Sequence, residues 1–98
     1  MAIKSFKNKA TEDINYGVTS KLSRKLLPIE LHEKAKTKLA RVAAATNLQD
    51  FQELKGNRFE FLKGNRKDQC SIRINDQFRI CFHWDGKDAI DVEIVDYH

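Results

Sequence analysis

The sequence has little of what builds disulfide-stabilised, metal-bound or membrane-anchored proteins. Two cysteines, one proline and four glycines occur among its 98 residues. Cys70 and Cys81 lie in apolar stretches without C-x-x-C spacing, so neither a disulfide framework nor a zinc site is expected. No apolar run reaches the length of a membrane span, and Met1–Phe6 lacks the core of a signal peptide. We expect a cytoplasmic protein with reduced thiols, no cofactor and no membrane partner.

The length suits a single domain spanning residues 1–98. A chain this short buries one core between two layers and leaves no room for a deep catalytic cleft. Any chemistry is therefore expected on an open face, with a substrate larger than a pocket of this protein.

Positive charge is in excess and unevenly distributed. Eighteen Lys and Arg stand against 14 Asp and Glu, for a formal net charge of +4. Seven basic and three acidic residues lie from Lys55 to Arg79, whereas Asp85 to Asp96 holds five acidic residues and one lysine. This balance favours a polyanionic partner, bound by residues before Arg79.

Helical spacing is clearest in the first half of the chain. Residues Pro28 to Thr46 are predicted to form a long helix that packs on a sheet. Its apolar stripe consists of Leu31, Ala35, Leu39 and Val42. The basic stretch Val18 to Leu27 has only a weak pattern, and we expect it to be mobile or ordered by a partner.

Alternation of polar and apolar residues begins at Arg58 and predicts strands. Ile3 to Phe6 reads as a short strand as well. The later candidates are Arg58–Phe61, Cys70–Ile74, Phe78–Phe82 and Ile90–Ile94. The prediction is an α+β fold: an antiparallel sheet of about four strands with N-terminal helices packed on one face.

The apolar pattern also predicts how the strands pair. Opposing Ile72 to Ile80 gives one apolar face, requires the three-residue loop 75–77, and places Arg73 across from Arg79. Extending the same alternation to the last strand opposes Val92 to Ile80 and Glu93 to Arg79.

Five polar residues then share the face that points away from the core. They are Glu60, Arg73, Arg79, Glu93 and Tyr97. Because directly opposed like charges are destabilising, the repulsion between Arg73 and Arg79 must be offset by negative charge. An anionic ligand is one source of relief, and salt bridges to Glu60 and Glu93 on a solvated face are the other.

This face has the groups that metal-independent RNA cleavage requires. The reaction needs a base for the ribose 2′-hydroxyl, cations for the phosphorane-like transition state, and an acid for the leaving 5′-oxygen. Glu60 is the candidate base, Arg73 and Arg79 are candidate phosphate clamps, and Tyr97 or His98 is the candidate acid. Flanking phosphates are assigned to Arg58, Lys63, Arg66 and Lys67.

Four segments together resemble the HigB/GraT branch of the RelE/ParE toxin superfamily. They are Arg58–Asn65, Cys70–Asn75, Gln77–Phe82 and Asp96–His98. The resemblance implies a RelE-like, microbial-RNase-like domain and a type II toxin that cleaves mRNA on the translating ribosome. It also implies a HigA/GraA-like helix-turn-helix antitoxin as partner, with operator DNA contacted only through that antitoxin.

The resemblance assigns roles by position. Arg79 matches the phosphate-stabilising arginine, and Asp96, Tyr97 and His98 match the active-site tail of HigB toxins. Glu60 stands where HigB toxins often carry a histidine, but it matches the glutamate base of the related YoeB toxins. A ParE-like gyrase inhibitor or a corepressor that only binds antitoxin remains the alternative.

Overall fold

The computed structural model describes residues 3–52, 58–62 and 68–96. In this part of the chain the elements are α1 (Lys9–Asn15), α2 (Lys21–Leu26), the 3-10 turn η1 (Ile29–Leu31), α3 (His32–Ala44), α4 (Gln49–Gln52), β1 (Glu60–Phe61), β2 (Gln69–Arg73), β3 (Phe78–Trp84) and β4 (Ala89–Asp96).

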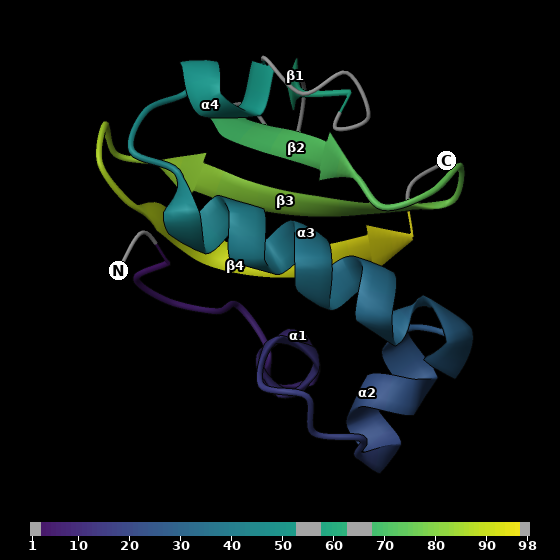
Figure 1. Ribbon diagram of the computed structural model, residues 1–98. Coiled ribbons are helices and arrows are strands. Elements are labelled where there is room, and N and C mark those ends of the chain that lie inside the picture. The colour runs from purple at the N-terminus through teal and green to yellow at the C-terminus, as the bar shows by residue number, and fades with distance from the viewer. Residues whose placement is uncertain (1–2, 53–57, 63–67, 97–98) are drawn as a thin grey trace.

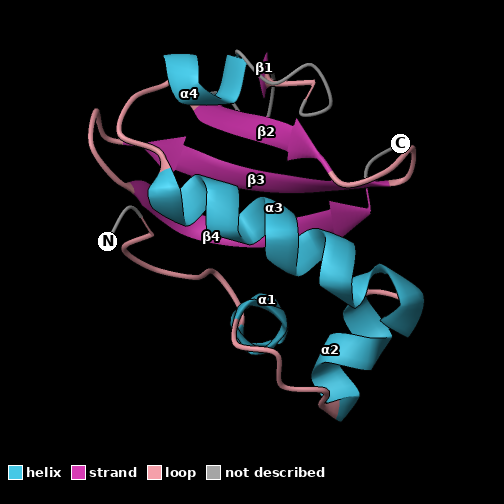
Figure 2. Cartoon of the chain, in the orientation of Figure 1, coloured by secondary structure: helices cyan, strands magenta, loops and turns pink. Residues whose placement is uncertain are grey.

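The described strands form one antiparallel sheet in the order β1-β2-β3-β4. Figure 1 and Figure 2 show α3 lying across one face of this sheet, with α1 and α2 beyond its β4 edge. The predicted α+β architecture is therefore confirmed. Of the polar residues predicted for the other face, Glu60, Arg73, Arg79 and Glu93 lie there.

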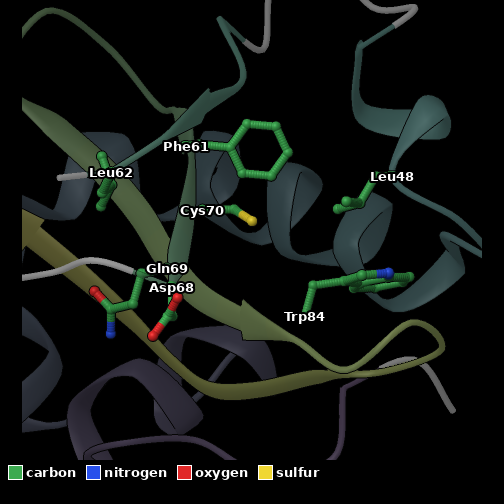
Figure 3. Close-up of a pocket in the computed structure, with 7 residues that line it drawn as sticks. All are labelled: Leu48, Phe61, Leu62, Asp68, Gln69, Cys70 and Trp84. Carbon is green, nitrogen blue, oxygen red and sulfur yellow. The ribbon is translucent and has the colours of Figure 1, made fainter.

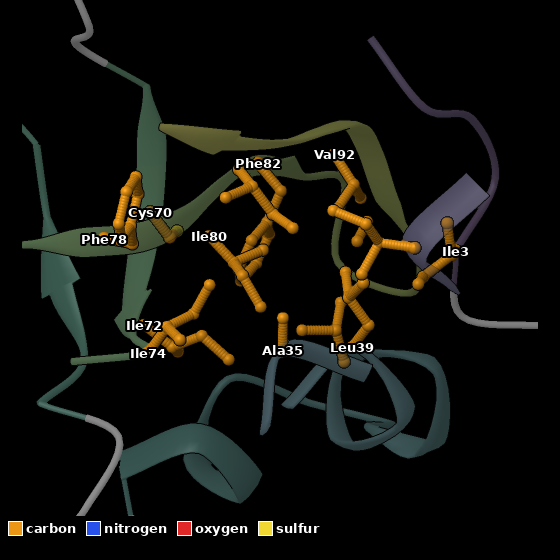
Figure 4. Close-up of a cluster of buried hydrophobic side chains, with 14 of the residues drawn as sticks. Ile3, Ala35, Leu39, Cys70, Ile72, Ile74, Phe78, Ile80, Phe82 and Val92 are labelled. Atoms are coloured by element: carbon orange, nitrogen blue, oxygen red, sulfur yellow. The ribbon is translucent and has the colours of Figure 1, made fainter. Parts of the chain in front are cut away.

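The core lies between α3 and the sheet. Ala35, Leu39 and Val42 of the predicted stripe are fully buried, and they belong to the same cluster as Ile72 and Ile80 (Figure 4). Burying such aliphatic side chains contributes about 1.5–3 kcal/mol each, so this contact holds the helix on the sheet.

The predicted pairing of β2 with β3 is confirmed. Ile72 opposes Ile80, and Arg73 opposes Arg79. The amide of Ile74 donates to the carbonyl of Phe78 at 2.9 Å, which closes the expected loop 75–77. The two arginines therefore lie side by side on the outer face of the sheet.

The predicted pairing of β4 with β3 is wrong by two residues. Ile80 opposes Ile94, and Arg79 opposes Val95. The turn holds four residues instead of three, because the carboxylate of Asp85 accepts two amides within it. A β-bulge at Asp91, with φ of +53°, adds the second residue. A shift of two keeps Glu93 on the outer face but moves it away from Arg79, where the sequence had placed it.

The N-terminal segment runs parallel to β4. Ile3 and Phe6 form isolated bridges with Ala89 and Val92, so the expected first strand is an extended stretch outside the named strands. Ser5 holds the bulge through its Oγ, which accepts the amide of Asp91 at 2.9 Å.

The stretch Val18 to Leu27, expected to be mobile or ordered by a partner, contains α2. Ser20 and Ser23 form a capping box, in which each side chain accepts the other residue's amide. The Oγ of Ser20 also donates to the carboxylate of Asp13 at 2.7 Å, which ties α2 to α1. This signal is short and polar, so apolar periodicity misses it.

Candidate active site

Arg79 is the most firmly held charged side chain of the outer face. Its Nε donates to the Oγ of Ser71 at 2.8 Å, and its Nη2 donates to the carbonyl of Arg58. The residue is 7% exposed. A guanidinium fixed by neighbours on two strands and on the segment before β1 keeps its orientation when an anion arrives.

Glu60 forms an ion pair with Arg79, with 3.0 Å between Oε1 and Nη1. Pairing of β1 with β2 sets Glu60 opposite Ser71, on the outer face as predicted. About half of the Glu60 side chain is exposed, so a substrate hydroxyl can reach the carboxylate. Candidate base and candidate phosphate clamp are thus in direct contact.

Arg73 and Glu93 have other partners than the sequence suggested. The Nη2 of Arg73 binds the carboxylate of Asp76 in the β2–β3 loop. Glu93 opposes Cys81 and pairs with Lys7 at 3.7 Å. Of the two carboxylates proposed to relieve the arginine pair, Glu60 is shown to contact Arg79, while Glu93 binds a lysine.

Asp96 lies at the end of β4, opposite Phe78. Its carboxylate accepts the side-chain amide of Gln77 at 3.1 Å, so β4 ends beside the loop that carries Asp76. The remaining predicted site residues lie outside the described residues; they are Tyr97, His98, Lys63, Arg66 and Lys67. Arg58 is exposed.

Further positive charge lies near Arg73. Lys38 of α3 is 8% exposed. Burial lowers the pKa of this lysine, and the nearby charges of Arg41, Lys34 and Arg73 lower it further. The positive charges of Arg41, Lys34 and Arg73 therefore lie close enough to Lys38 to act on it.

Ser71 and His83 share the outer face but were not predicted as site residues. Ser71 has the same parity as Arg73, so alternation alone could have placed it there. For His83, Nδ1 lies 3.1 Å from the carbonyl of Asp68 and Nε2 lies 3.4 Å from Nε2 of Gln69. A carbonyl only accepts, so the proton is on Nδ1 and Nε2 accepts from the amide.

The described helices include none that is both long and apolar enough to span a bilayer.

The fold is that of a RelE-like toxin. A solved structure, "The structure of YoeB dimer from Staphylococcus aureus", superposes with a TM-score of 0.60 at 20% sequence identity. That match covers 100% of this chain and 99% of the other chain, and at this identity it supports the fold alone.

The family is shown by sequence. The model described as "RelE-like toxin of type II toxin-antitoxin system HigB" matches residues 4–98, and the chain belongs to this HigB-like toxin family. Toxin HigB-1 of Vibrio cholerae serotype O1 is 42% identical over 60 residues. This alignment spans 61% of the chain and 63% of that relative's length.

Proposed function

We propose that this protein is a metal-independent endoribonuclease that cleaves mRNA on the translating ribosome in the cytoplasm. The observation that carries the proposal is the 3.0 Å contact between Glu60 and a clamped Arg79. In this mechanism Glu60 takes the proton of the ribose 2′-hydroxyl, and the 2′-oxygen attacks phosphorus. Arg79 stabilises the charge that develops on the phosphate oxygens.

The leaving 5′-oxygen needs a proton as its bond to phosphorus breaks. Tyr97 or His98, the two residues that come after Asp96, supplies it in the proposal. Arg73 binds the same or the next phosphate. Arg58, Lys63, Arg66 and Lys67 hold flanking phosphates, in keeping with the positive charge of this half of the chain.

The test compares Glu60→Gln with Glu30→Gln, an exposed glutamate of η1 that serves as the matched control. Each variant is induced in cells, and the 5′ ends of cellular mRNA are mapped. We expect Glu60→Gln to lower cleavage about a hundredfold and Glu30→Gln to cleave like the wild type. The cuts should fall within translated regions and follow the reading frame, because the ribosome presents the substrate.

Arg79→Ala and removal of His98 complete the test. Both should abolish toxicity while circular dichroism shows a folded protein that still binds antitoxin. Full toxicity of both variants would exclude this active site and favour the non-nucleolytic alternatives, a gyrase inhibitor or a corepressor. For the antitoxin we propose a HigA/GraA-like helix-turn-helix protein, to be tested by co-purification and rescue of growth.

A further inference from the structure

A pocket opens on the other side of the edge strand from Glu60. Its volume is about 480 Å³, and the described residues that line it are Leu48, Phe61, Leu62, Asp68, Gln69, Cys70 and Trp84. This volume falls within the range of about 300–1,000 Å³ typical of small-molecule sites. A single nucleobase therefore fits.

Two kinds of surface meet in this pocket. Figure 3 shows Phe61, Leu48 and Trp84 around the sulfur of Cys70, with Asp68 and Gln69 to one side. A nucleobase has the matching character, because its faces are apolar and aromatic and its edge is polar. A purely apolar ligand would leave the polar side unmatched.

The ring of Phe61 contributes little to the packing of the core. Phe61 opposes Cys70 of the core face, but it lies on the edge strand and is 60% exposed. Phe59 stacks on Phe51 with ring centroids 5.7 Å apart, whereas Phe61 meets only the edge of Phe59 among the described rings. An exposed aromatic ring at a pocket offers a base a surface on which to stack.

Asp68 lines the same pocket, and contacts with His83 hold its backbone in place. It has a φ of +72°, a left-handed conformation that is strained for most residues. Its carbonyl accepts from His83, whose other ring nitrogen is engaged by Gln69. These contacts fix the backbone from which the exposed carboxylate of Asp68 projects. Strained residues fixed in this way cluster at ligand sites.

We propose that this pocket binds a nucleobase next to the scissile phosphate, and that Asp68 selects guanine. The inference rests on the proposed endoribonuclease function. Glu60 and Phe61 are consecutive, so their Cα atoms lie about 3.8 Å apart, and an RNA strand crossing β1 reaches both sides. A carboxylate accepts two neighbouring N–H groups, which guanine presents at N1 and N2.

The experiment uses tetranucleotides of 2′-O-methyluridine, which lack the attacking hydroxyl and are not cleaved. One 2′-O-methylguanosine replaces a 2′-O-methyluridine at each position in turn, and binding is followed by the fluorescence of Trp84, the single tryptophan of the chain. We expect one guanine position to bind about tenfold tighter than the all-uridine strand.

Two variants test which residue stacks on the base and which residue selects guanine. Phe61→Ala should weaken binding of every strand about tenfold. Asp68→Asn should remove the guanine preference and keep the stacking, and asparagine tolerates the left-handed backbone. Leu22→Ala, at an exposed apolar residue of α2, is the control and should bind like the wild type.

If the wild type binds all strands equally, the inference is overturned. Unchanged binding by Phe61→Ala also overturns it. Either result is expected if the pocket holds a protein segment instead of a nucleobase. Cleavage in cells without any guanine preference overturns the inference but supports the endoribonuclease. Guanine-dependent binding by a wild type that does not cleave supports the pocket and overturns the proposed activity.

Discussion

At the scale of single residues, the outer face depends on a serine that carries no charge. Ser71 is fully buried and accepts the Nε–H of Arg79. Without the Ser71 hydroxyl, the Nε–H of the nearly buried Arg79 loses its hydrogen-bond acceptor. Such a loss is more damaging than removal of a hydrogen bond at the surface.

We predict that Ser71→Ala lowers the free energy of unfolding by about 1–3 kcal/mol. Urea denaturation measures the change. Thr37→Ala is the control, because this exposed hydroxyl of α3 bonds only to the carbonyl of Glu33 within the helix. A Ser71→Ala variant as stable as the control would show that Arg79 does not need this contact.

Asp13 makes stability depend on pH. The hydroxyl of Ser20, and next to it Lys9, lower the pKa of Asp13 below its ordinary 3.8. A carboxylate with a lower pKa in the folded state contributes stability above its unfolded pKa, and this is lost as the pH falls through the folded value. Asp13→Asn should therefore lose less stability than the wild type on acidification below about pH 4.

Urea denaturation at several acidic pH values gives both curves. Asp50 and Asp85 also have lowered pKa values, so the informative quantity is the difference between wild type and variant. Parallel curves would show that the ionised form of Asp13 does not stabilise the fold.

At the scale of elements, the bulge in β4 decides which residues face the site. Before the bulge, Ala89 opposes Trp84 and faces the core. The extra residue shifts the alternation, so that Val92 and Ile94 face the core after the bulge. Its left-handed residue, Asp91, makes two bonds with Ser5: the Asp91 amide donates to the Oγ of Ser5, and this hydroxyl donates to the Asp91 carboxylate.

We predict that two substitutions at Asp91 differ in their effect on the free energy of unfolding. Asp91→Val should lower the free energy of unfolding by about 1–2 kcal/mol, because a β-branched residue fits the left-handed region poorly. Asp91→Gly should change stability by less than about 1 kcal/mol, since glycine adopts this φ freely. Thermal unfolding of both variants checks this, and equal stability would mean that the bulge shifts elsewhere.

At the scale of the whole molecule, the two thiols report on the integrity of the core. Cys70 is 3% exposed and Cys81 is fully buried. Burial raises the pKa of Cys70 to about 11. Since the thiolate is the reactive form, native Cys70 is doubly protected from disulfide reagents.

We predict that Ellman's reagent labels both thiols only as fast as the protein unfolds. The labelling rate should rise with urea in parallel with the unfolding rate, and the unfolded chain should react at both cysteines. Rapid labelling of the native protein, independent of urea, would show that the sheet opens locally around Cys70 or Cys81.

The sequence by itself determined the fold class, the apolar stripe of α3 and the face on which Glu60 and Arg79 lie. Helical and strand periods are local properties, and a strand with one buried face fixes the parity of every residue in it. The same alternation placed Arg73 beside Arg79, because the β2–β3 loop is short and tightly bonded.

Only the tertiary structure decided the pairing of β4, the clamp on Arg79 and the pocket beside Phe61. Parity survives a shift of two residues, so no apolar pattern detects the longer turn and the bulge that Ser5 holds from far along the chain. The clamp joins Ser71, Arg58 and Glu60 through bonds between separate segments. Such bonds depend on distances that exist only once helices and sheet have packed.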